Sequence, residues 1–73
     1  MKLEYGCWMV WEWWPRHGAW WPDPAAHGDS YAEAVQEYTS TECITDLEWR
    51  DRESRGVVKC LRTTLSTEIR AGE

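Results

Sequence analysis

The chain has 73 residues, with 8 basic and 13 acidic side chains and a net charge of −5 at pH 7. This length leaves room for one small domain over residues 1–73, frayed at residues 71–73, and excludes a multidomain protein. The negative charge opposes contact with phosphate backbones and anionic lipids, which makes nucleic acid a poor partner. The longest apolar run, residues 7–11, is too short to span a bilayer, and residues 1–4 lack the hydrophobic region of a signal peptide. We therefore expect a cytoplasmic protein without membrane partners.

Tryptophan is the unusual component of the sequence. The chain contains seven Trp and no Phe, and six of the seven lie between Trp8 and Trp21. A small chain needs large side chains to offset the entropy that folding costs, and each Trp can bury about 150–250 Å². A few of these residues would build a core, but six so close together exceed that need. Some of them are therefore expected at the surface.

Residues 3–13 predict a strand, because apolar residues recur with period two. Every odd-numbered position in this segment is apolar and is expected to meet the core. The opposite face would then carry Trp8, Val10 and Trp14. Residues 14–18 contain Pro15 and Gly18 and predict a turn. A short return strand, residues 19–21, would end at the prolines that follow it.

A helix is predicted to begin after Ser30, because Ser30 and Glu33 have the spacing of a capping box. Its apolar residues recur at helical spacing and would form one stripe, namely Tyr31, Ala34, Val35 and Tyr38. A helix of about ten residues is marginal alone, so it is expected to pack on a sheet.

The rest of the chain predicts two more strands. Residues 39–41 weaken the helix, and residues 43–50 alternate, with Cys43, Thr45, Leu47 and Trp49 on one face. Residues 57–69 are rich in Val, Leu and Thr and follow Gly56, which predicts a second hairpin. The fold class is therefore expected to be α+β, with the order ββαββ and one antiparallel sheet with a single helix packed on one face.

Alternation along the first hairpin places Trp residues on both faces of this sheet, although one helix covers only one face. We expect the uncovered residues to form a partner-binding surface, since Trp is enriched at interface hot spots. The expected surface consists of Trp8, Val10, Trp14, Trp20 and Trp21, of which either Trp20 or Trp21 is exposed. The expected partners are a second copy of the chain, as a homodimer, and another protein. The alternative is a small-ligand site in which the Trp platform binds a sugar or a cationic molecule.

No catalytic or metal-binding pattern is evident. His17 and His27 lack zinc-type spacing, and no nucleophile pairs with a base. We expect no cofactor, no metal and no enzymatic activity. Cys7, Cys43 and Cys60 are odd in number and contain no Cys-x-x-Cys pair, so they are predicted to be unpaired and, from the strand alternation, mostly buried.

The segment Arg55–Thr64, with Thr67 and Glu68, is rich in Thr and Arg. It resembles the closing strands of small accessory proteins of actinobacterial phages, and the Trp-rich composition agrees with that origin. The resemblance covers under a third of the chain. It implies a non-enzymatic protein that binds or inhibits a host or phage protein.

Overall fold

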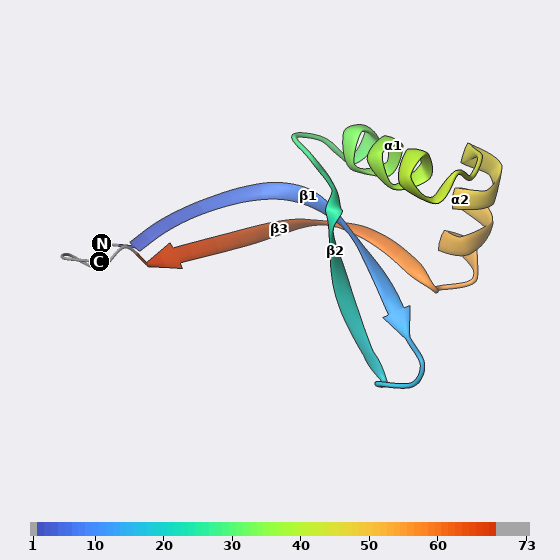
Figure 1. Cartoon of the computed structure of the whole chain (residues 1–73), viewed down its shortest axis with the longest axis horizontal. Coiled ribbons are helices and arrows are strands. Elements are labelled where there is room, and N and C mark those ends of the chain that lie inside the picture. Colours follow the sequence, from blue (N-terminus) through green and yellow to red (C-terminus); the bar gives the residue numbers. More distant parts are fainter. Residues whose placement is uncertain (1, 69–73) are drawn as a thin grey trace.

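The computed structural model describes residues 2–68 of the chain and the side chains of residues 6–64, so the predicted frayed end lies outside the described residues. The elements follow in the order β1 (Lys2–Trp14), β2 (Ala19–Gly28), α1 (Tyr31–Glu42), α2 (Asp46–Ser54) and β3 (Val58–Glu68). The strands form one antiparallel sheet in the order β2-β1-β3, and both helices lie to one side of it (Figure 1). The predicted small α+β class is confirmed, but the ββαββ order with one helix is wrong.

The first hairpin closes at the predicted turn. The amides of His17 and Gly18 both donate to the carbonyl of Trp14, at 3.0 and 2.9 Å. Gly18 has a φ of 59°, a left-handed conformation that glycine adopts without a steric penalty. The hydrogen bonds that close the turn thus join residues that are neighbours in the sequence.

β2 is longer than the predicted return strand at residues 19–21. It is an edge strand of the sheet, so Pro22 and Pro24 need not donate to a ladder on its outer side. Met9 of β1 pairs with His27, but Trp11 pairs with Pro22, so the register shifts between these pairs. Residues 23–26 of β2 are therefore extra residues that form a bulge. The prolines thus distort the strand without ending it.

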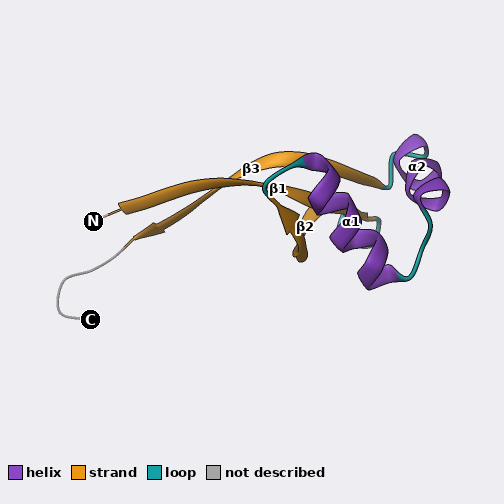
Figure 2. Cartoon of the chain, turned by 90° about the horizontal axis from the view of Figure 1, so that it is seen from above, coloured by secondary structure: helices purple, strands orange, loops and turns teal. Residues whose placement is uncertain are grey.

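β3 forms where a strand was predicted, but its partner is β1 and not residues 43–50. The pairing runs from Lys2 opposite Glu68 to Glu12 opposite Val58. β1 is therefore the central strand. Figure 2 shows the ribbon of β1 and β3 continuing away from the helices, beyond the end of β2.

Local hydrogen bonds explain the start of α1. The Ser30 hydroxyl accepts the amide of Glu33 at 3.2 Å, as the predicted capping box requires. The Glu33 carboxylate accepts the amide of Asp29 at 2.9 Å, one residue before the expected position. Three residues of the predicted apolar stripe are buried, namely Ala34, Val35 and Tyr38.

The strand predicted at residues 43–50 is wrong, because two helix ends lie there. Cys43 has a φ of 56° and ends α1, and the Thr45 hydroxyl accepts the amide of Glu48 at 3.2 Å and begins α2. The alternation of this segment has no structural meaning, because only Trp49 is buried in α2. Within residues 2–68, no helix is long and apolar enough to cross a bilayer.

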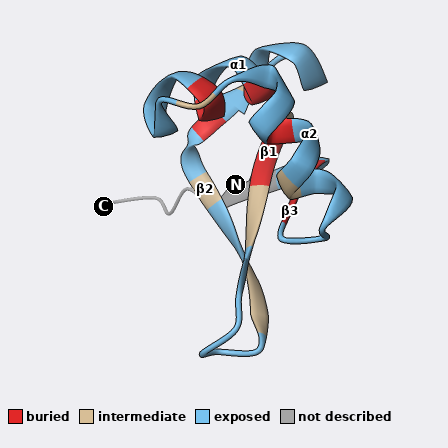
Figure 3. Cartoon of the chain, turned by 90° about the vertical axis from the view of Figure 1, so that its right-hand side faces the viewer, coloured by how far each residue is buried: buried red, intermediate tan, exposed pale blue. Residues whose placement is uncertain are grey.

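The core lies between α1 and the even-numbered side of β1. Val10 is fully buried there, and it opposes Cys60 in the sheet. The cluster around it combines sheet and helix residues, namely Ala26, Ala34, Val35, Tyr38, Trp49 and Val58. Figure 3 shows these buried segments where α1 crosses the strands. The prediction that the odd-numbered face of β1 meets the core is therefore wrong for most of that face, although Met9 is buried there and the two faces alternate as predicted.

The three thiols are unpaired, as predicted, but only Cys60 is buried; Cys7 is half-buried and Cys43 is exposed at the end of α1. Burial raises the pKa of the Cys60 thiol to about 11, and Glu53 adds to the shift. Because the thiolate is the reactive form, alkylation near pH 8 should modify Cys43 quickly and Cys60 slowest. Timed alkylation followed by peptide mass spectrometry measures both rates.

Denaturant provides the control for this experiment, because it should bring the labelling rates of the thiols together. Equal rates for Cys43 and Cys60 in the folded protein would contradict the placement of β3 against α1.

Candidate functional site

The outer part of the first hairpin extends beyond the helices (Figures 1 and 3). We call residues 13–22 the hairpin arm. Three of its indoles are exposed: Trp13 to 37%, Trp14 to 47% and Trp21 to 49%. A hollow of about 510 Å³ opens at the tip of the arm and is lined by Trp13, Trp14, Pro15, Arg16 and His17.

One face of the arm holds Trp14, His17 and Trp21. The Trp21 backbone pairs with Glu12, whose carboxylate contacts Tyr38 of α1, so this is the side of the sheet on which the helices lie. The ring centres of Trp14 and Trp21 are 5.9 Å apart, and His17 lies 5.6 Å from Trp14 and 6.1 Å from Trp21. The three rings form one aromatic surface that α1 does not cover.

The opposite face holds Trp13 and Trp20, whose ring centres are 5.6 Å apart in an edge-to-face arrangement. Lys59 of β3 places its ammonium nitrogen 4.1 Å from the centre of the Trp20 ring, close enough for a cation–π contact. The indole of Trp11 donates to the hydroxyl of Thr63 at 3.0 Å. These contacts hold Trp11 and Trp20 half-buried and leave Trp13 more exposed.

The five residues expected to bind a partner do not lie on one surface. Trp14 and Trp21 are exposed on the arm, and Trp20 is half-buried on its other face. Val10 is fully buried and cannot contact a partner. Trp8 is half-buried and packs against the core. Val10 and Trp8 are removed from the expected surface because α1 covers the even-numbered side of β1.

Sequence reasoning missed four residues of the arm and its surroundings. The odd position of Trp13 predicts a core residue, because it shares the apolar face of β1. Arg16 and His17 lie in the predicted turn, and the sequence carries no signal that both line the hollow at the tip. Lys59 could be placed only after β3 was known to pair with β1, because that pairing sets Lys59 opposite Trp11.

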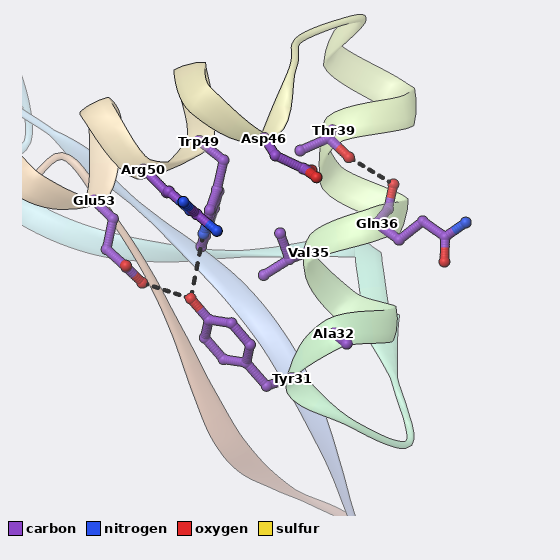
Figure 4. A pocket seen from close by; sticks show the side chains of 9 residues that line it. All are labelled: Tyr31, Ala32, Val35, Gln36, Thr39, Asp46, Trp49, Arg50 and Glu53. Atoms are coloured by element: carbon purple, nitrogen blue, oxygen red, sulfur yellow. Dashed lines mark hydrogen bonds between the residues drawn. The ribbon is translucent and has the colours of Figure 1, made fainter.

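A second hollow, of about 630 Å³, lies between α1 and α2 (Figure 4). The indole of Trp49 donates to the hydroxyl of Tyr31 at 3.2 Å, and this hydroxyl donates to the carboxylate of Glu53 at 2.8 Å. Desolvation and the bond to Glu53 raise the pKa of Tyr31. Because these polar groups form hydrogen bonds with one another, we interpret the hollow as part of the contact between α1 and α2.

A second polar chain joins both helices to the sheet. Arg52 donates to the hydroxyl of Tyr38 at 2.7 Å, and this hydroxyl donates to the carboxylate of Glu12 at 3.4 Å. Burial raises the pKa of Glu12, and the nearby carboxylates of Glu42 and Asp23 add to the shift. Burial also raises the pKa of Tyr38. This chain lies at the base of the arm and fixes its position relative to the helices.

The histidines lie apart from these chains. A ring nitrogen of His27 lies 2.7 Å from the carbonyl oxygen of Pro24, and His17 packs on the arm indoles. Among the residues that the structure describes, no three His, Cys, Asp or Glu side chains are grouped in a way that could hold a metal ion. The arm is therefore the candidate site that best combines exposure with a defined geometry.

Comparisons of the chain with protein-family models, with curated proteins and with solved structures found no match.

Proposed function

We propose that the protein is a non-enzymatic protein-binding module that contacts another protein chain through its hairpin arm. The observation that carries this proposal is the exposure of Trp13, Trp14 and Trp21 on an arm that extends beyond the helices. Large apolar surfaces are seldom left exposed without a binding role, and buried Trp residues dominate the energy of many interfaces. The ring packing within the arm also reduces the entropy that binding would cost.

Two expectations from the sequence, a homodimer and a phage-type accessory protein, are specific versions of this proposal. A homodimer would use the arm to bind a second copy, and light scattering over a range of concentrations tests that form. The resemblance of Arg55–Thr64 to phage accessory proteins implies binding to a host or phage protein, which belongs to the same class of function. The alternative of a cationic ligand is less favoured, because Arg16 and Lys59 lie beside the indoles.

The double substitution Trp14→Ala/Trp21→Ala tests the proposal. Both indoles are about half exposed, so their loss should leave the fold and its thermal unfolding nearly unchanged. Each lost anchor should weaken partner binding by about 2 kcal/mol or more. The measurement compares the proteins that immobilised wild type and variant retain from a cell extract, together with the oligomeric mass of each.

Leu47→Ala is the matched control, because Leu47 is an exposed apolar residue on α2, away from the arm. It should retain the same proteins as the wild type. The proposal is wrong if the folded double variant keeps the wild-type partners and mass.

A further inference from the structure

Charge is divided unevenly over the molecule. Residues 29–56, which contain both helices, carry eight acidic and three basic side chains. The hairpin arm carries Arg16 and no carboxylate, and Lys59 lies over its Trp20 ring. Two cations, Arg16 and Lys59, therefore lie beside the exposed indoles of a chain whose net charge is −5.

The nearest carboxylates lie at the base of the arm and are bonded within the protein. Glu12 accepts a hydrogen bond from Tyr38, and Asp23 accepts the amide of Ala25 at 3.1 Å. Both side chains are half-buried. Their charges remain, but they lie outside residues 13–22, so Arg16 is the charged side chain at the exposed tip itself.

Apart from the imidazole of His17, the polar side chains that the arm presents are hydrogen-bond donors. An indole N–H, a guanidinium and an ammonium group all donate and cannot accept, whereas an ionised carboxylate only accepts. Trp13, Trp14 and Trp21 present their indoles to solvent, and Arg16 lines the hollow between the rings and the turn. Carboxylates beside apolar side chains would match both the donors and the ring surfaces.

We propose that the hairpin arm binds an apolar segment bearing carboxylates on a different protein, an inference that rests on the proposed function. The indoles cover the apolar side chains of this segment. Arg16 at the tip and Lys59 beside Trp20 contact its carboxylates. Electrostatic complementarity of this kind raises the association rate and selects against other partners.

Two other occupants fit the arm less well. A nucleic acid would meet few cations and an acidic remainder of the chain, and Lys59 already covers a face of Trp20. A second copy docked arm to arm would bring like charges together, because an isologous contact repeats the same groups on both sides. Both alternatives are outcomes of the following experiment.

The experiment measures binding of fluorescently labelled probes to the whole chain by anisotropy. The first probe is a short peptide that alternates glutamate with leucine and phenylalanine, and the second has glutamine in place of each glutamate. A lysine version of the peptide and single-stranded oligothymidylate complete the set. The glutamate peptide should bind at least about tenfold more tightly than the glutamine peptide and should weaken as salt is added.

Variants separate this inference from the proposed function. Arg16→Gln and Lys59→Gln should each weaken binding of the glutamate peptide by roughly two- to fivefold, as expected for an exposed ion pair, and leave the glutamine peptide unaffected. Arg55→Gln is the control, since Arg55 pairs with Asp51 on α2, outside the arm. Trp14→Ala/Trp21→Ala should weaken both peptides.

Each remaining outcome contradicts one of the two proposals. Equal binding of the glutamate and glutamine peptides, or no binding of either, overturns the acidic partner. Tighter binding of oligothymidylate than of the glutamate peptide overturns the acidic partner in favour of a nucleic acid. A dimer that dissociates on Trp14→Ala shows that a second copy occupies the arm, which overturns the acidic partner and leaves the proposed function standing. Peptide binding that survives Trp14→Ala/Trp21→Ala contradicts the proposed function itself.

Discussion

Replacing Trp49 with Ala is expected to lower the free energy of unfolding by about 3–5 kcal/mol. Trp49 is only 3% exposed, packs edge-on against Tyr38 at 5.3 Å and donates to the hydroxyl of Tyr31. It is the only described residue of α2 that is buried, so its loss removes the apolar contact of this helix and leaves only the hydrogen bonds of Arg52 and Glu53. A chain of this size has a total stability of roughly 4–11 kcal/mol, so Trp49→Ala should lose a large share of it.

Chemical denaturation followed by circular dichroism measures this loss, and Leu47→Ala is the control on the same helix. Leu47 is 75% exposed, so its substitution should change the stability by less than about 0.5 kcal/mol. Equal stability of the two variants would show that α2 does not pack against α1 as described. It would also contradict the hydrogen bonds between α1 and α2 that Figure 4 shows.

Gly28→Ala is expected to cost about 1–3 kcal/mol, because the position has no room for a side chain. A Cβ atom at Gly28 would lie 2.5 Å from the Cβ of Glu33 and 3.1 Å from the amide nitrogen of Ala34. Gly28 ends β2 opposite Trp8, so the first turn of α1 would have to move away from the sheet. Thermal unfolding of the variant should show a lower midpoint temperature. Hydrogen exchange should show faster exchange of the backbone amides in the core.

Gly6→Ala provides the matched control in β1. A Cβ at Gly6 would meet the Arg62 side chain at 3.6 Å, an ordinary contact with a flexible group. The substitution should therefore be neutral or raise the stability by about 0.5–1 kcal/mol through reduced chain entropy. The close approach of α1 to β2 is wrong if Gly28→Ala is as stable as Gly6→Ala.

The candidate site shows how much of the exposure of the Trp residues the alternation in β1 can predict. Alternation correctly placed Trp13 and Trp14 on opposite faces of β1, and it predicted that some indoles stay exposed. It could not say which face α1 covers, because both faces of β1 carry apolar residues. The choice of the odd-numbered face made Val10 an interface residue, although it is fully buried.

Local sequence patterns are enough to predict the strand at β1, the turn at Gly18, the start of α1 after Ser30 and the concentration of Trp in one hairpin. Each of these depends on neighbouring residues, through period-two alternation, a left-handed glycine or a side-chain cap. The helix at residues 46–54 was also encoded locally, by Thr45 and Glu48, but a stronger alternating pattern masked that cap.

The partner of β3, the face that α1 covers and the exposure of each indole could not be predicted in this way. These features depend on contacts between residues far apart in the chain, such as Lys59 with Trp20 and Tyr38 with Glu12. A strand's alternation is the same whichever neighbour it pairs with, so the sequence contains no local signal for that choice. The contact of Lys59 with the indole-rich arm therefore became recognisable only once β3 was placed beside β1.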